Sequence, residues 1–122
     1  MVNKKLKYCN YFSSNPFLID VFKVDTFSII MQLSKVALEL MYYIFDTKSF
    51  LEDKFVFDIN EFKQFANKKT DASATQALRE LCSFQVIAKT TTFRVYWVNK
   101  NIFLDEKGME FLIKRLKTRR NI

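Results

Sequence analysis

The 122-residue chain contains no histidine, one glycine, one proline and two cysteines. Without histidine it lacks the commonest general base, most zinc sites, and Ser-His or Cys-His nucleophile pairs. One glycine cannot build a G-x-G-x-x-G loop or a P-loop. Cys9 and Cys82 supply neither a disulfide scaffold nor a four-thiolate metal site. No cluster of carboxylates calls for a bound metal ion. We therefore expect that the chain is not an enzyme and that it binds no metal, cofactor or small-molecule substrate.

Long hydrophobic runs are also missing. The longest stretch without charge, residues 8–19, contains Asn, Ser and Pro and is too short to span a membrane. No apolar block of the signal-peptide type follows the first lysines. Hydrophobic residues make up 49% of the chain, and 14 of them are phenylalanines, which is enough for one core. These features predict a small cytoplasmic domain with reduced cysteines.

The charge is unevenly distributed along the chain. The net charge is +7, and it divides into +3 for residues 1–19, −4 for 20–62, +5 for 63–102 and +3 for 103–122. An acidic segment between basic ones is typical of a protein that presents one basic surface. Such a surface favours a polyanion as the partner.

Helix-capping residues and apolar spacing predict the first half of the fold. Residues 1–16 read as a basic arm, and residues 17–24 as a short strand. Asp25 or Thr26 caps a short helix, and Ser34 begins a core helix over about 35–46 with a wide apolar face. A strand at 55–57 follows, and then a helix at about 59–67 that Asp58 caps. Thr70 or Asp71 caps the next helix, at about 72–84. The last predicted elements are strands at 86–91 and 94–98 and a helix at about 105–117.

The helix at 72–84 has two different faces. Its inner face holds Ala74, Leu78, Leu81 and Cys82, and its outer face is polar. We expect one core to bury the following side chains: Leu40, Ile44, Phe62, Phe65, Leu78, Leu81 and Trp97.

This order of elements predicts an α+β, mostly α fold: a winged helix-turn-helix with an N-terminal extension and a C-terminal helix. Its parts are a basic arm at 1–16, a DNA-binding domain at 17–104 and a basic amphipathic helix at 105–122. The apolar side of that last helix either packs back on its own chain or pairs with its twin in a homodimer. We favour the dimer slightly.

A winged helix reads DNA with the polar face of its second helix. Gln can pair with adenine and Arg with guanine in the major groove, so the base-reading candidates are Ser73, Gln76 and Arg79. Candidates for the DNA backbone flank them: Lys68, Lys69, Thr70, Thr75, Lys89, Thr91, Thr92 and Arg94. A secondary basic set comprises Lys4, Lys5, Lys7, Arg115, Lys117, Arg119 and Arg120.

Three segments of the chain resemble the RepL-type plasmid replication proteins of bacteria. They are LSKVALELMYYI at 33–44, ATQALREL at 74–81 and VYWVNKNIF at 95–103, within a similarity that covers about 17–104. The chain has Lys100 where that family usually has proline. The resemblance implies a winged-helix initiator that binds a plasmid or phage-like origin, recruits host replication proteins and has no catalytic centre.

Sequence-specific binding of double-stranded DNA is therefore the expected function, most simply in the initiation of plasmid replication and in plasmid copy control. A winged-helix transcriptional regulator would use the same surface. A winged-helix protein–protein adaptor would instead leave the outer face of 72–84 idle and bind through exposed aromatic side chains. Salt dependence separates DNA binding from the adaptor.

Overall fold

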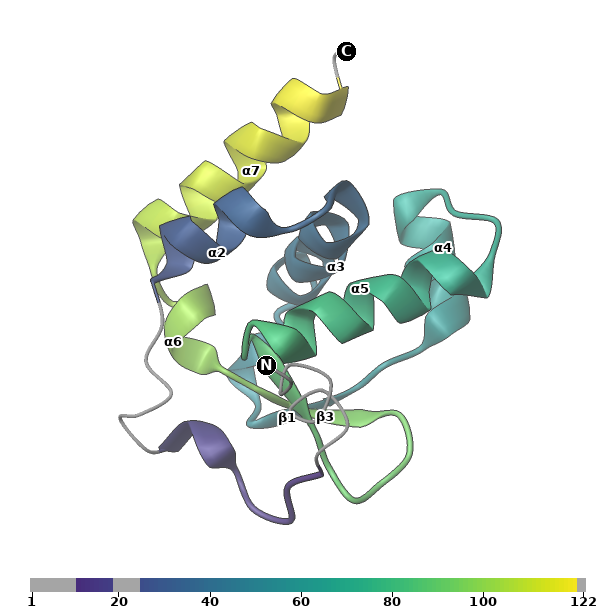
Figure 1. The fold of residues 1–122 in the computed structure, drawn as a ribbon, viewed down its shortest axis with the longest axis vertical. Helices are drawn as coiled ribbons and strands as arrows, with labels where there is room; N and C mark the ends of the chain where they lie inside the picture. Colours follow the sequence, from purple (N-terminus) through teal and green to yellow (C-terminus); the bar gives the residue numbers. More distant parts are fainter. Residues whose placement is uncertain (1–10, 19–24, 121–122) are drawn as a thin grey trace, which may run out of the picture.

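The computed structural model describes residues 11–18 and 25–120, with the backbone alone at 118–120. This part of the chain is a mostly helical α+β fold with six α-helices and three short strands (Figure 1). The helices are α2 (Thr26–Gln32), α3 (Lys35–Asp46), α4 (Ile59–Ala66), α5 (Asp71–Ser83), α6 (Lys100–Phe103) and α7 (Glu106–Arg120). The strands are β1 (Lys54–Val56), β2 (Ile87–Lys89) and β3 (Val95–Val98), and two 3-10 helices are η1 (Pro16–Leu18) and η3 (Ser49–Leu51).

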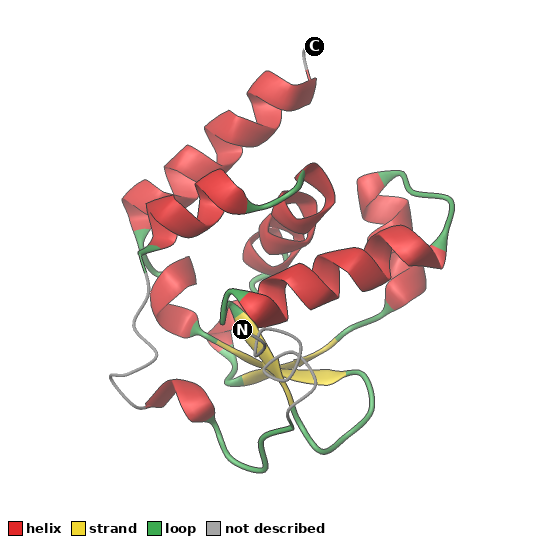
Figure 2. Ribbon diagram, viewed as in Figure 1, coloured by secondary structure: helices red, strands yellow, loops and turns green. Residues whose placement is uncertain are grey.

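The three strands form an antiparallel sheet in the order β1-β3-β2. Strand β3 is central: its Tyr96 pairs with Phe55 of β1, and its Trp97 pairs with Ala88 of β2. The strands are too short to make a core by themselves, and the helices lie over one side of the sheet (Figure 2). We call residues 87–98, which contain β2, β3 and their loop, the hairpin.

Short polar side chains start the helices where the sequence predicts. The Asp25 carboxylate accepts hydrogen bonds from the backbone of Phe27 and Ser28, and Ser34 Oγ accepts one from Ala37. Asp58 caps α4 in the same way. These caps satisfy backbone donors that have no partner inside the helix. They confirm the predicted starts of α2, α3 and α4.

Helix α3 lies at the centre of the core, packed against α4, α5 and α7. The predicted core residues Leu40, Ile44, Phe62 and Leu81 are fully buried. Phe65 and Leu78 are only partly buried at its edge, so for these two the prediction was too strong. Other side chains that lose all or nearly all contact with solvent are Ile30, Leu33, Leu38, Met41, Ile87, Ile102, Phe103 and Leu112.

Trp97 is buried, but outside this core. Neighbouring residues of a strand point to opposite faces of the sheet, and Tyr96 and Val98 take the face toward the helices. The Trp97 indole Nε1 donates to the Phe12 carbonyl oxygen at 2.8 Å. The N-terminal segment and η1 therefore cover the other face of β3.

Three local predictions were wrong. Residues 16–18 form η1 rather than a strand, and the remainder of the predicted strand, 19–24, lies outside the described residues. Helix α6 begins within the expected polar break at 99–101 and continues to Phe103, and its Ile102 and Phe103 are buried. Arg94, expected in the second strand of the hairpin, belongs to the loop and has a φ of 66°.

Helix α7 packs on its own chain. Asp105 Oδ1 accepts from the Gly108 backbone at 3.0 Å at the start of α7, and Met109, Leu112 and Leu116 are buried. A Cβ on Gly108 would lie 2.6 Å from Thr26 Cγ2, so the one glycine lets α7 approach α2 closely. The apolar stripe that favoured a homodimer is thus covered within one chain, and the dimer stays a prediction without that support.

The segment that precedes η1 docks on the free edge of β2. Tyr11 forms a parallel bridge with Lys89, and the Phe12 amide donates to the Lys89 carbonyl oxygen at 2.9 Å. None of the helices described is long and apolar enough to cross a membrane.

Candidate nucleic-acid interface

Helix α5 presents the polar face predicted from its sequence. Thr75, Gln76 and Arg79 are exposed, and Ser73 is half-buried. The opposite side of the helix buries Ala74, Ala77, Leu81 and Cys82. Because small residues lie along this inner side, α5 packs closely on α3 and its polar side faces away.

Gln76 does not stand alone on that face. Its Nε2 donates to Glu80 Oε2 at 2.9 Å, and the same carboxylate accepts from Ser34 N at 2.9 Å and from Ser34 Oγ at 2.6 Å. Glu80 thereby places a negative charge at the N-terminus of α3, where the helix dipole favours it. Burial by itself would raise the pKa of Glu80, but the hydrogen bonds from Ser34 and Gln76 outweigh it and lower the pKa.

This lowered pKa predicts how the α3–α5 contact responds to acid. The folded state favours the charged carboxylate, so the stabilisation is fully present above pH 4.5, the ordinary glutamate value, and is lost as the pH falls through the folded-state pKa. Glu80→Gln is expected to melt below the wild type at neutral pH. The difference should shrink as the pH drops below 4.5, and thermal melts across a pH series measure it. A pH-independent difference would mean that the charge of Glu80 does not matter.

The two lysines in the loop from α4 to α5 have different surroundings. Lys69 and Thr70 are exposed, at the start of α5, where backbone N–H groups suit a phosphate. Lys68 Nζ instead lies 3.0 Å from Oε1 of the buried Glu39 in α3. Lys68 is therefore engaged within the fold, and Lys69 is the lysine of this loop that is presented to solvent.

The loop of the hairpin is fixed by a buried threonine. Thr90 Oγ1 donates to the Val95 carbonyl oxygen at 2.9 Å and accepts from the Thr92 backbone at 3.0 Å. Arg94 supplies the left-handed residue that a loop of this kind needs. Thr91, Thr92 and Arg94 are exposed around this support.

Helix α5 and the hairpin flank an open cleft of about 220 Å³. Thr75 and Leu78 line it from α5, and Lys89 and Arg94 from the hairpin. Three of the predicted backbone-contacting residues, Thr75, Lys89 and Arg94, are thus brought to one place. Thr91 and Thr92 lie beyond it in the loop, and Lys69 lies at the far end of α5.

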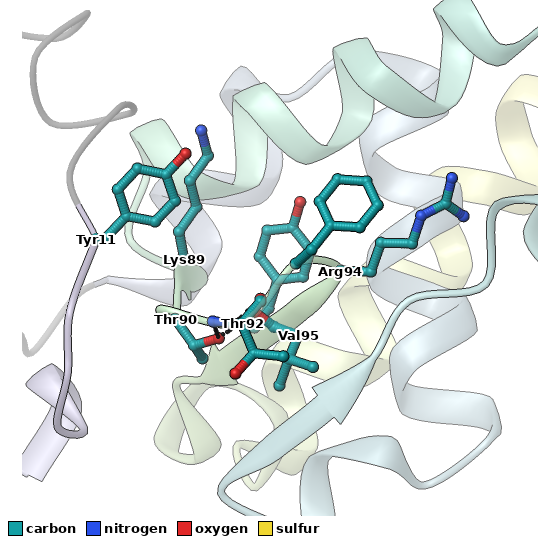
Figure 3. A pocket seen from close by; sticks show the side chains of 8 residues that line it. Tyr11, Lys89, Thr90, Thr92, Arg94 and Val95 are labelled. Carbon is teal, nitrogen blue, oxygen red and sulfur yellow. Dashed lines mark hydrogen bonds between the residues drawn. The ribbon is translucent and has the colours of Figure 1, made fainter.

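A second pocket adjoins this cleft at the hairpin, and the two share Lys89, Phe93, Arg94 and Tyr96 (Figure 3). Tyr11, Lys89, Thr90, Thr92, Arg94 and Val95 line it, with Phe93 and Tyr96. The sequence did not single out Tyr11 or Phe93. For Phe93 a signal existed, because a large apolar ring between Thr92 and Arg94 in a polar turn has no evident partner. For Tyr11 none existed, since its contact with Lys89 joins distant parts of the chain.

The secondary basic set is only partly described. Lys4, Lys5 and Lys7, and the side chains of Arg119 and Arg120, lie outside the described residues. Lys117 is exposed on α7, whereas Arg115 is half-buried and its Nε atom is buried. These two residues lie away from the hairpin, on a helix at the other side of the molecule (Figure 1).

Neither a reactive thiol nor a metal cluster marks this surface. Cys82 is buried, and burial raises the pKa of its thiol to about 12, which keeps it protonated. Across residues 11–18 and 25–120, no three His, Cys, Asp or Glu side chains lie together in a way that could hold a metal ion. Comparison with known proteins finds no matching family model, no matching curated protein and no matching solved structure.

Proposed function

We propose that this chain is a winged helix-turn-helix protein that binds double-stranded DNA, with α5 as the recognition helix and the hairpin as the wing. The observation that carries the proposal is the cleft that α5 and the hairpin share, with Lys89 and Arg94 along one wall. The element order α3, β1, α4, α5, β2, β3 and the sheet order β1-β3-β2 support it. This is the order expected of a winged helix, in which a helix-turn-helix is followed by a two-stranded wing.

The polar face of α5 gives this proposal its chemistry. Gln76 and Arg79 can read base edges in the major groove. Lys69 precedes α5, and Lys89 and Arg94 line the cleft beside it, at positions suited to phosphates. For the biological target we propose an origin of replication, on the strength of the resemblance of residues 33–44, 74–81 and 95–103 to RepL-type replication proteins.

Substitutions on the two kinds of position are expected to differ. Lys69→Ala should weaken binding to all duplexes alike and lower the salt slope by about one. Gln76→Ala should cost about 1–3 kcal/mol at the preferred site only. It also frees Glu80 from one hydrogen bond, which leaves a carboxylate on that face. The measurement is binding across a salt series to a duplex selected from a random pool and to its scrambled version.

Lys107→Ala is the matched control, because it removes one exposed lysine from the first turn of α7, away from α5 (Figure 1). It should leave affinity for both duplexes nearly unchanged. Equal losses for Gln76→Ala on both duplexes would show that α5 does not read bases. If no variant changes binding and the salt slope is near zero, the adaptor interpretation replaces DNA binding.

A further inference from the structure

Two aromatic rings on the hairpin side of the molecule are left largely uncovered. Phe93 in the loop is 83% exposed, more than any other large hydrophobic side chain of the described residues, and Tyr11 is 66% exposed. Most other aromatic side chains of the described chain are buried or half-buried. A single exposed ring is unremarkable, but these two line the same pocket.

Each of these rings has a cation over it. Lys89 Nζ lies 5.1 Å from the centroid of the Tyr11 ring, and Arg94 Cζ lies 5.0 Å from that of Phe93. Both distances fall in the range of cation–π attraction. In Figure 3, Tyr11 and Lys89 lie side by side at one end of the pocket, and Arg94 lies at the other. The pocket is thus a track that carries a ring and a positive charge at each end.

The backbone at one end of this track has a left-handed conformation at a residue with a basic side chain. Arg94 has a φ of 66°, a conformation that glycine adopts without the steric penalty of a Cβ atom. Strained residues of this kind gather at functional sites, where the side chain is needed in spite of its backbone. The Arg94 guanidinium also has no acidic partner in the part of the chain that the structure describes.

We propose that this track binds single-stranded nucleic acid, with unpaired bases stacked on Tyr11 and Phe93 and phosphates beside Lys89 and Arg94. Exposed rings combined with cations are the chemistry that such strands require, because every base offers a π face. A duplex keeps those faces inside its stack, and an acidic peptide would use the cations without the rings. The inference goes beyond the proposed function, which concerns a duplex and helix α5. The pocket and the cleft share Lys89, Phe93, Arg94 and Tyr96, whereas Tyr11 lines only the pocket.

The test compares an oligo(dT) strand, which stays unpaired, with the oligo(dA)·oligo(dT) duplex. Phe93→Leu and Tyr11→Leu remove each ring and keep an apolar side chain, and both rings are too exposed for the change to disturb the fold. Each variant is expected to lose about 5- to 150-fold in affinity for oligo(dT). For Tyr11→Leu, whose ring lies outside the cleft beside α5, affinity for the duplex should stay within about twofold of the wild type.

Two further variants sharpen the comparison. Phe27→Leu removes a ring that is 43% exposed on α2, on a different side of the molecule, and should leave oligo(dT) binding unchanged. Arg94→Gly removes the charge and relieves the backbone, so the variant should melt no lower than the wild type. Its oligo(dT) affinity should fall, and its salt slope for the single strand should decrease by about 0.7.

Several outcomes overturn the inference: a wild type that does not bind oligo(dT), ring variants that bind it as the wild type does, equal losses on strand and duplex, or an equal loss for Phe27→Leu. If the wild type binds oligo(dT) through the rings but fails to bind any duplex, the inference stands and the proposed function fails. If Lys69→Ala weakens only the duplex and Tyr11→Leu only the strand, both stand.

Discussion

Phe62→Ala is expected to lower the free energy of unfolding by about 3–5 kcal/mol. The Phe62 ring is fully buried. It packs edge-on against Tyr43 at 5.7 Å between ring centroids and at a tilt against Phe57 at 5.9 Å. It therefore joins α4 to α3 and to the residue that follows β1. Alanine would lose the buried apolar surface and leave a cavity that these rigid rings cannot fill. Because small domains are stable by only about 5–15 kcal/mol, the loss is a large share of the total.

Urea denaturation followed by circular dichroism measures this change. Phe93→Ala is the matched control, since it removes the same side chain from a position that is 83% exposed. It should change stability by no more than about 0.5 kcal/mol. A loss below about 1 kcal/mol for Phe62→Ala would show that the space between α3 and α4 closes when the ring is removed.

The second large effect concerns the ion pair between Lys68 and Glu39. The Glu39 side chain is 6% exposed, and Lys68 Nζ approaches its Oε1 to 3.0 Å, in a geometry that falls short of a directed hydrogen bond. Lys68→Met keeps the length of the side chain but leaves the carboxylate buried without its cation. Breaking a buried pair in this way costs about 3–5 kcal/mol. Because Lys68 is itself 24% exposed, we expect the lower end, about 3 kcal/mol.

A double-mutant cycle separates the pair from its surroundings. Replacing both partners, with Glu39→Leu and Lys68→Met, should restore most of the stability. Two apolar side chains carry no charge, so their burial has no desolvation penalty that an ion pair must offset. Urea melts of the wild type, both single variants and the double variant give the coupling energy. If Lys68→Met alone is as stable as the wild type, water or another group compensates Glu39. The double variant also tests the original assignment of Lys68 to a phosphate, since DNA affinity can then be measured on a stable protein.

Local signals were sufficient to predict most helices. Asp25, Ser34 and Asp58 precede apolar residues at helical spacing, and each cap acts within three residues along the chain. The hairpin was predicted with a loop at 92–93, whereas the observed loop is 90–94. Nothing in the sequence marks Arg94 as left-handed. Helix α6 was missed because its Lys100 and Asn101 resemble a polar break, while its helical state follows from the burial of Ile102 and Phe103 in the core.

The candidate site was predictable only in its outline. The polar face of α5 follows from helical periodicity, and the exposure of Gln76 and Arg79 agrees with it. The partners of these side chains do not follow, because they come from distant positions: Glu80 is held by Ser34, 46 residues away. The same reason hid the engagement of Lys68 by Glu39 and the contact of Tyr11 with Lys89. Periodicity predicts which way a side chain faces, but only tertiary structure determines what it meets.

The docked segment at Tyr11 and Phe12 has a consequence for the behaviour of the protein at high concentration. An uncovered sheet edge offers unpaired backbone groups to other chains and is a template for aggregation. The Phe12 amide donates a hydrogen bond to the Lys89 carbonyl oxygen, and the Phe12 carbonyl oxygen accepts one from the Trp97 indole. These two residues therefore cover the edge of β2 at Lys89: while they are in place, that part of the edge is occupied by the protein's own chain rather than by a neighbour's strand.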